Sequence, residues 1–125
     1  MKLIMEESLK ALIVDDEIDM CYLLIDILKH KNLQASFVNT ISDAKRVLQD
    51  ENHSIVFLDN HLPDGFGINF IREIKKIHPR VKIVMISAHD TNMDREKAYF
   101  RGVDHFIGKP FTREMIFKTL DILLN

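Results

Sequence analysis

The sequence contains one cysteine, three prolines and no tryptophan among 125 residues. A lone cysteine excludes an internal disulfide and is typical of a reducing cytoplasm. Cys21 lies within an apolar helical pattern, which favours a buried thiol over a reactive one. No apolar run approaches the roughly 18 residues of a membrane-spanning helix. Glu6 and Glu7 also interrupt the N-terminal apolar residues too early for a signal peptide. We therefore expect a soluble, cytoplasmic protein with no membrane attachment.

The sequence also has no large excess of charge of either sign, because 17 basic and 19 acidic residues leave a net charge of -2. Without a strongly basic surface, we expect this domain not to bind nucleic acid directly. Apolar residues make up 46% of the chain, which suffices for a hydrophobic core, and the length fits one domain. We divide the chain into a short lead-in over residues 1–8 and a single domain over residues 9–125.

Short apolar runs alternate with amphipathic helical patterns throughout this domain. The runs are rich in Val, Ile and Phe and lack strict polar alternation, which is typical of strands buried on both faces. We expect strands at residues 9–14, 35–38, 55–58, 81–86 and 105–107. The helical patterns are defined by the following apolar positions: Ile18, Cys21, Leu24, Ile25 and Leu28; Ala44, Val47 and Leu48; Phe70, Ile71, Ile74 and Ile77; Met93, Ala98, Tyr99 and Phe100; and Ile116, Leu120, Leu123 and Leu124.

Residues that typically begin or end helices lie at the ends of these patterns. Ser42 or Thr40 suits the N-cap of the second helix, Pro79 ends the third, and Gly102 ends the fourth. The fourth helix has the sparsest apolar face, so we expect it to be the least firmly packed. Five strands alternating with five helices predict a three-layer α/β domain around a parallel sheet. In such a domain, ligands bind beyond the carboxyl ends of the strands.

Polar side chains follow four of the five expected strands. Asp15 and Asp16 follow the first, Asp59 the third, Ser87 the fourth and Lys109 the fifth. Two unpaired carboxylates at ~4 Å repel each other by about 4 kcal/mol at an effective dielectric of about 20. A fold tolerates this only when a cation lies among them or one of them is protonated. Oxygen ligands completed by water favour Mg²⁺.

Mg²⁺ beside a carboxylate and a lysine indicates phosphoryl chemistry, in which the carboxylate is the nucleophile. Each residue alone also has a structural interpretation. The Asp15–Asp16 pair suits a helix N-cap, Asp59 lies in a segment rich in turn formers, and Lys109 suits a solvated loop. Their joint occurrence at strand ends favours the functional interpretation.

Four stretches carry a resemblance to a known family: Leu12–Glu17, Phe57–Gly65, Met85–Ala88 and Gly108–Pro110. In this order and spacing, the chain resembles the receiver domain of bacterial two-component response regulators, over residues 9–124. The resemblance implies a flavodoxin-like (βα)5 doubly wound sandwich with strand order 2-1-3-4-5. It also implies a phosphorylation-activated switch for signal transduction rather than an enzyme acting on other molecules.

The resemblance also assigns roles at the strand ends. Asp59 accepts a phosphoryl group from a sensor histidine kinase or a phosphotransfer protein, and Lys109 pairs with that group. For Mg²⁺, Asp16 is a direct ligand, Asp15 acts mainly through water, and Asp59 and the backbone carbonyl of His61 complete the protein ligands. The peptide bond before Pro110 is expected to be cis.

In the same family, Ser87 matches the switch hydroxyl and Phe106 the coupled aromatic residue. Many members carry tyrosine at that position, so a polar latch made by its hydroxyl is absent here. Phosphorylation is expected to turn Ser87 and Phe106 inward and to change the surface of the fourth helix, fifth strand and fifth helix. His61 and His89 flank the path of the hydrolytic water and are candidates for setting phosphate lifetime, unless they are simply exposed loop residues.

Other functions remain open to a lesser degree. A flavin carrier of this architecture needs a phosphate loop rich in Ser, Thr and Gly after the first strand, where this chain has Asp15, Asp16 and Glu17. An aspartate-nucleophile phosphatase resembles this chain less, because it has two aspartates separated by one residue there, whereas Asp15 and Asp16 are adjacent. A receiver-like interaction domain that never takes phosphate is the third alternative. The sequence leaves open the cognate kinase, the downstream output domain or protein, homodimer formation on phosphorylation, and whether the domain is part of a longer regulator.

Overall fold

The computed structural model describes residues 9–124, so the predicted lead-in at 1–8 lies outside the described residues, as does Asn125. Five parallel strands form the main sheet in the order β2-β1-β3-β6-β7. They are β1 (Leu9–Val14), β2 (Leu33–Val38), β3 (Ile55–Asp59), β6 (Lys82–Ser87) and β7 (His105–Gly108). The predicted doubly wound, flavodoxin-like sheet is confirmed, because its order along the chain reads 2-1-3-4-5 once the small hairpin described below is set aside.

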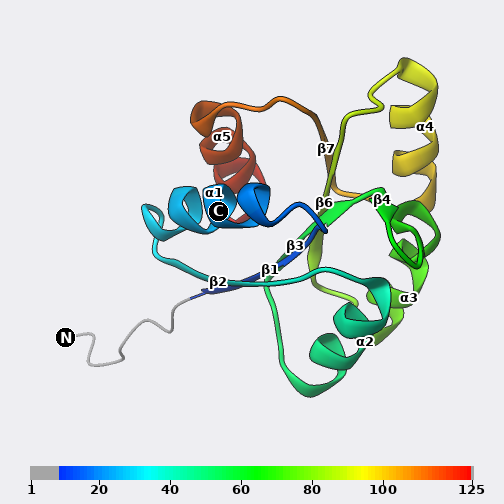
Figure 1. The fold of residues 1–125 in the computed structure, drawn as a ribbon, viewed down its shortest axis with the longest axis horizontal. Helices are drawn as coiled ribbons and strands as arrows, with labels where there is room; N and C mark the ends of the chain where they lie inside the picture. Colours follow the sequence, from blue (N-terminus) through cyan, green and yellow to red (C-terminus); the bar gives the residue numbers. More distant parts are fainter. Residues whose placement is uncertain (1–8, 125) are drawn as a thin grey trace.

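Five α-helices cover the two faces of this sheet (Figure 1). They are α1 (Ile18–Lys29), α2 (Ile41–Asp50), α3 (Ile71–Ile77), α4 (Asn92–Arg101) and α5 (Arg113–Leu124). One core cluster joins the sheet to α1 and α5 through Cys21, Leu24, Leu28, Ile116 and Leu120. The other cluster lies on the opposite face, where α2, α3 and α4 pack. Within the described residues, no helix is long and apolar enough to cross a membrane.

Burial of both sheet faces explains the continuous apolar strands. Along β3, Val56 and Leu58 belong to the cluster under α2 and α3, whereas Ile55 and Phe57 belong to the cluster under α1 and α5. Successive side chains of a strand point to opposite faces, so both sets must be apolar. One helical prediction needs correction: Ile18 is 43% exposed because it is the first residue of α1, whereas Ile27, which the pattern omitted, is buried.

The loop after β3 contains structure that the sequence did not predict. It forms a two-stranded antiparallel hairpin, β4 (His61–Leu62) with β5 (Gly65–Phe66), followed by the short 3-10 helix η1 (Gly67–Asn69). A Cβ atom at Gly67 would lie 2.3 Å from the backbone oxygen of Asp59, so only glycine allows this close approach. The hairpin loop therefore folds directly against the end of β3.

Side-chain caps fix two helices near the same end of the sheet. Thr40, rather than Ser42, caps α2 by accepting a hydrogen bond from the Asp43 backbone. Thr91 and Asp94 form a capping box at the start of α4, and Gly102 ends that helix in the left-handed conformation with φ 112°. Ala98 is the only buried residue of α4, which confirms its sparse apolar face.

Candidate functional site

Three carboxylates meet at the carboxyl end of the sheet. Asp15 follows β1 and Asp59 ends β3, and these strands are neighbours with Val14 paired to Leu58. One carboxylate oxygen each from Asp15, Asp16 and Asp59 lie within 4.8 Å of one another. Asp15 and Asp59 are buried, with 2% and 6% of their surface exposed, whereas Asp16 is exposed. The sheet order therefore brings together the acids that the sequence predicted to converge.

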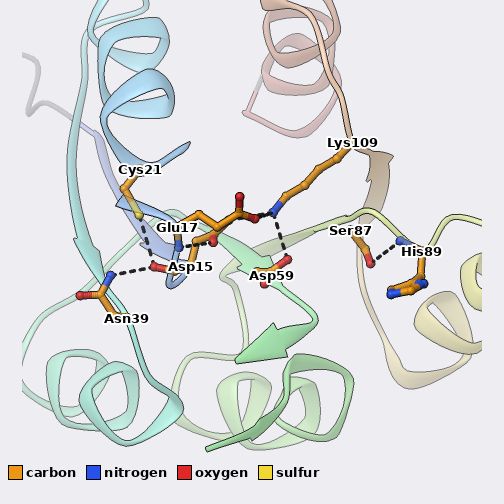
Figure 2. A network of polar contacts seen from close by, with 8 residues as sticks. All are labelled: Asp15, Glu17, Cys21, Asn39, Asp59, Ser87, His89 and Lys109. Atoms are coloured by element: carbon orange, nitrogen blue, oxygen red, sulfur yellow. Dashed lines mark hydrogen bonds and ion pairs between the residues drawn. The ribbon is translucent and has the colours of Figure 1, made fainter. Parts of the chain in front are cut away.

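Asp15 is held in place by its own loop and by β2. Its backbone N–H donates to the Val38 carbonyl (3.1 Å), and its backbone carbonyl accepts from the side-chain amide of Asn39 (2.8 Å). Its Oδ1 accepts from the backbone N–H of Glu17 (2.9 Å), while the Cys21 thiol donates to its carbonyl (3.3 Å). Figure 2 shows the contacts of Asp15 with Asn39, Glu17 and Cys21. The carboxylate is thus fixed before any ligand binds.

Lys109 supplies the positive charge of the site. Its Nζ lies 3.2 Å from Asp15 Oδ2, 3.3 Å from Asp59 Oδ1 and 2.9 Å from Glu17 Oε1 (Figure 2). The Lys109–Pro110 peptide bond is cis, as predicted. The backbone N–H of Lys109 donates to the backbone carbonyl of Ser87 (2.9 Å), which joins the end of β7 to the end of β6. Sequence patterns did not predict the contact of Lys109 with Glu17, although Glu17 follows Asp15 and Asp16 directly.

Burial and mutual repulsion perturb the ionisation of this cluster. Burial, then the charge of Asp15, raises the pKa of Asp59 to about 6, because the opposing effect of Lys109 is smaller. Burial also raises the pKa of Asp15, against the Glu17 hydrogen bond and Lys109. Burial alone would lower the pKa of Lys109, but the Glu17 hydrogen bond and the charges of Asp59 and Asp15 outweigh it and raise that pKa. The ammonium is therefore charged at neutral pH.

Cys21 contacts this cluster but has little chemical reactivity. Its side chain is buried, as predicted, and burial followed by the charge of Asp15 raises the pKa of the thiol to about 12. Because the thiolate is the nucleophilic form of cysteine, this side chain is inert at neutral pH.

The donor set fits a hard divalent cation. Asp15, Asp16 and Asp59 offer only oxygen ligands, and with Glu17 they carry four formal negative charges against the single charge of Lys109. Oxygen ligands in an open, partly hydrated site suit Mg²⁺ or Ca²⁺. The acidic cluster is therefore a candidate metal centre, and the role of the His61 carbonyl in it stays a prediction.

The two predicted switch residues have different environments. Ser87 is the last residue of β6 and is 1% exposed, and its Oγ accepts a hydrogen bond from the His89 backbone (3.1 Å). Phe106 is 3% exposed and lies under the guanidinium of Arg95, 4.9 Å from its ring centre. The Phe106 ring is thus already buried in this structure, and its inward turn on phosphorylation stays a prediction. The Tyr99 hydroxyl accepts from the Phe106 backbone (3.1 Å), a contact that sequence patterns did not reveal.

His61 in β4 and His89 in the loop after β6 contact each other. Their ring centres lie 4.5 Å apart with the planes tilted by 50°, and the His61 ring also meets Phe66 edge-on at 5.4 Å. Both imidazoles are exposed. The hairpin and the loop after β6 thus bring together the two side chains that the sequence named as candidates for setting phosphate lifetime.

Comparison with known proteins identifies the family. The model of the response regulator receiver domain matches residues 11–121. The chain belongs to this family. The receiver-domain resemblance drawn from four short stretches of sequence is therefore confirmed over nearly the whole domain.

Relatives in the family are longer proteins. The chain is 33% identical over 101 residues to the response regulator protein PilR of Pseudomonas aeruginosa, covering 81% of this chain and 23% of PilR. It is 32% identical over 112 residues to the transcriptional regulatory protein CssR of Bacillus subtilis, covering 89% of this chain and 49% of CssR. The receiver chain thus spans less than half the length of these two curated relatives.

Solved structures share the fold. A CheY-like receiver domain from Methanospirillum hungatei superposes with a TM-score of 0.87 at 20% identity, covering 93% of each chain. A response regulator from Burkholderia pseudomallei, whose structure contains a phosphorylated aspartic acid and a calcium ion, superposes with a TM-score of 0.84 at 20% identity, covering 90% of this receiver and 66% of that chain.

The raised pKa of Asp59 predicts a pH-dependent stability. Because the folded-state pKa is about 6 against an ordinary 3.8, the contribution of this group is fully present below about pH 4 and is lost as the pH rises through about 6. In chelator, we expect Asp59→Asn to raise the free energy of unfolding by about 1–3 kcal/mol near pH 8 and to change it little near pH 4. Urea unfolding at both pH values measures this difference.

Asp50→Asn, at an exposed position of α2, is the matched control and should follow the wild type at both pH values. An Asp59→Asn variant whose advantage over the wild type is the same near pH 4 and near pH 8 would contradict the raised pKa.

Proposed function

We propose that this receiver is a Mg²⁺-dependent switch in which Asp59 accepts a phosphoryl group from the phosphohistidine of a sensor kinase or phosphotransfer protein. The observation that carries the proposal is a buried carboxylate of raised pKa beside Asp15 and the Lys109 ammonium. With a pKa of about 6, Asp59 is mostly ionised at neutral pH yet is more basic than an ordinary aspartate, which suits a nucleophile.

The transfer needs four contributions from the chain. An Asp59 carboxylate oxygen attacks phosphorus, the bond from phosphorus to the imidazole nitrogen breaks, and the imidazole leaves with the bonding electrons. Lys109 exchanges its contact with Asp59 for the arriving phosphoryl oxygens, whose charge it neutralises. Asp15 and Asp16 would hold Mg²⁺, which would supply further neutralisation of charge on those oxygens. Ser87 donates its hydroxyl hydrogen to the phosphate.

The chain is proposed to catalyse only its own phosphorylation and dephosphorylation. Phosphorylation shifts the population toward a state with an altered surface on α4, β7 and α5, which controls an output domain or a separate partner and allows a homodimer to form. Two features support this role for α4: its single buried residue and its position directly after the Ser87 loop. An interaction domain that never takes phosphate is disfavoured because the carboxylates and the lysine all converge.

Acetyl phosphate with Mg²⁺ tests the proposal without a kinase. We expect intact-mass spectrometry to show one added phosphoryl group on the wild type, none on Asp59→Asn, and none in excess chelator. Lys109→Ala should lower the rate by about 100-fold, because a preorganised charge opposite the transferring group is removed. Asp50→Asn, with its exposed acid on α2, should be labelled like the wild type. Label that persists on Asp59→Asn, or a wild type that gains none, would contradict the proposal.

The contact between His61 and His89 makes phosphate lifetime a second measurable property. Their rings lie 4.5 Å apart in the segments that follow Asp59 and Ser87, and we propose that they control access of the hydrolytic water. Removing either ring should change the decay rate of the phosphorylated form by about tenfold, and the double variant should differ from the sum of the single effects because the rings touch. Decay of labelled His61→Ala, His89→Ala and the double variant measures this, with His30→Ala, at the exposed position just after α1, as control. Unchanged phosphate lifetimes in both single variants would contradict a role for these histidines in hydrolysis.

A further inference from the structure

The segment after β3 turns back on itself through a very short hairpin. Its strands β4 and β5 have two residues each and pair in antiparallel register. Pro63 and Asp64 form the tip of this hairpin, between Leu62 and Gly65. An isolated two-stranded hairpin is at best marginally stable in water. Contacts outside its own ladder must therefore hold the segment that follows Asp59.

The base of the hairpin is anchored beside Asp59. The Asn60 backbone carbonyl accepts from the Gly67 N–H (2.8 Å), and the Asn60 side-chain oxygen accepts from the Ile68 N–H (2.9 Å). A Cβ atom at Gly67 would lie 2.3 Å from the Asp59 backbone oxygen, so the returning chain packs on the end of β3. These contacts join residues that are close in the sequence. They fix the base of the hairpin and do not reach its tip.

The tip of the hairpin is anchored to α2, which comes from an earlier part of the chain. Asp64 Oδ1 accepts from the Ile41 N–H (2.9 Å), and Asp64 Oδ2 accepts from the Ser42 N–H (3.0 Å). A Cβ atom at Gly65 would lie 3.1 Å from Ile41 Cδ1, so the backbone of the tip also packs on that side chain. The hydrogen bonds from Ile41 and then Ser42 lower the pKa of Asp64, so its carboxylate is ionised at neutral pH.

Asp64 also completes the N-terminus of α2. The first N–H groups of a helix have no partner within the helix, and a negative charge is favourable beside them. Thr40 accepts from the third residue of α2, Asp43, and Asp64 accepts from the first two. One cap therefore comes from the residue before the helix and the other from the hairpin. Only the second cap joins α2 to the segment that follows Asp59.

We propose that Asp64 is a positioning residue of the metal centre, because it holds the segment that carries His61 against the N-terminus of α2. The inference rests on the proposed function, in which the His61 backbone carbonyl is a Mg²⁺ ligand. His61 lies between the anchored base and the anchored tip of the hairpin. A ligand that is ordered before the ion arrives loses less conformational freedom on binding. Release of the tip would leave Asp15 in place but would loosen this carbonyl.

The same anchor makes the first turn of α2 respond to metal binding. Coupling between two sites is reciprocal, so contacts of Asp64 that favour Mg²⁺ binding are themselves favoured by bound Mg²⁺, and by the same factor. The loss of a helix cap typically corresponds to about a fivefold change in an equilibrium constant. We therefore expect Mg²⁺ to slow the exchange of the Ile41 and Ser42 N–H groups with water.

Three variants of the full chain test the proposal. Asp64→Ala removes both acceptor oxygens, whereas Asp64→Asn removes the charge and keeps one acceptor oxygen. Thr40→Ala is the matched control, because it removes the other cap of α2 and leaves the hairpin contacts intact. NMR titration with Mg²⁺ gives the dissociation constant of each variant. Exchange of the Ile41 and Ser42 N–H groups with water is measured by NMR with and without Mg²⁺, and urea unfolding measures stability.

The wild type and Thr40→Ala should bind Mg²⁺ equally well, although Thr40→Ala is less stable, and Mg²⁺ should slow the exchange about fivefold in both. Asp64→Ala should bind Mg²⁺ about fivefold more weakly, and Mg²⁺ should leave its exchange unchanged. Asp64→Asn should lie between Asp64→Ala and the wild type, because it keeps one of the two hydrogen bonds.

Three results would overturn the proposal. The first is wild-type Mg²⁺ affinity in Asp64→Ala. The second is an equal loss in Thr40→Ala, since the stability of α2 alone would then explain the effect. The third is an equal loss in Asp64→Asn and Asp64→Ala, which would assign the effect to charge. A wild type that binds no Mg²⁺ contradicts the metal centre of the proposed function itself, which separates the two failures.

Discussion

The ammonium of Lys109 among Asp15, Asp59 and Glu17 is the interaction on which this site depends. One positive charge lies within 3.3 Å of three carboxylates, two of which are buried. Without it, two buried carboxylates would face each other at a cost of several kcal/mol. Even with it, burial and then the charge of Asp15 raise the pKa of Asp59 above its usual value. The acidic cluster of Asp15, Asp16 and Asp59 could therefore hold a metal cation.

The fold holds these charges together through strand order. Because β1 lies between β2 and β3, Asp15 receives support from Val38 and Asn39 on one side and faces Asp59 on the other. The ends of β6 and β7 are joined by the hydrogen bond from the Lys109 backbone N–H to the Ser87 carbonyl, which holds these two residues beside each other. Because the Lys109 ammonium also contacts Asp59, the three residues lie at one edge of the sheet.

Sequence patterns predicted the sheet, its helices and the convergence of Asp15, Asp59, Ser87 and Lys109, because these follow from local periodicity and the geometry of parallel strands. They did not predict the β4–β5 hairpin, whose strands have two residues each and no measurable periodicity. They also did not reveal individual tertiary hydrogen bonds, among them the Phe106 backbone N–H with the Tyr99 hydroxyl and Lys109 with Glu17. Such contacts depend on rotamers and on the path of loops, which no repeat in the sequence encodes.

We propose that Asp59 is a buried carboxylate whose pKa stays raised until a divalent cation and a phosphoryl group complete the site. Carbon NMR of the Asp59 side-chain carboxyl, titrated with pH in chelator and again in saturating Mg²⁺, measures this pKa. We expect a pKa of about 6 without metal and a value lower by about one unit or more with Mg²⁺, since the cation favours the ionised form. An ordinary pKa near 3.8 that Mg²⁺ leaves unchanged would contradict it.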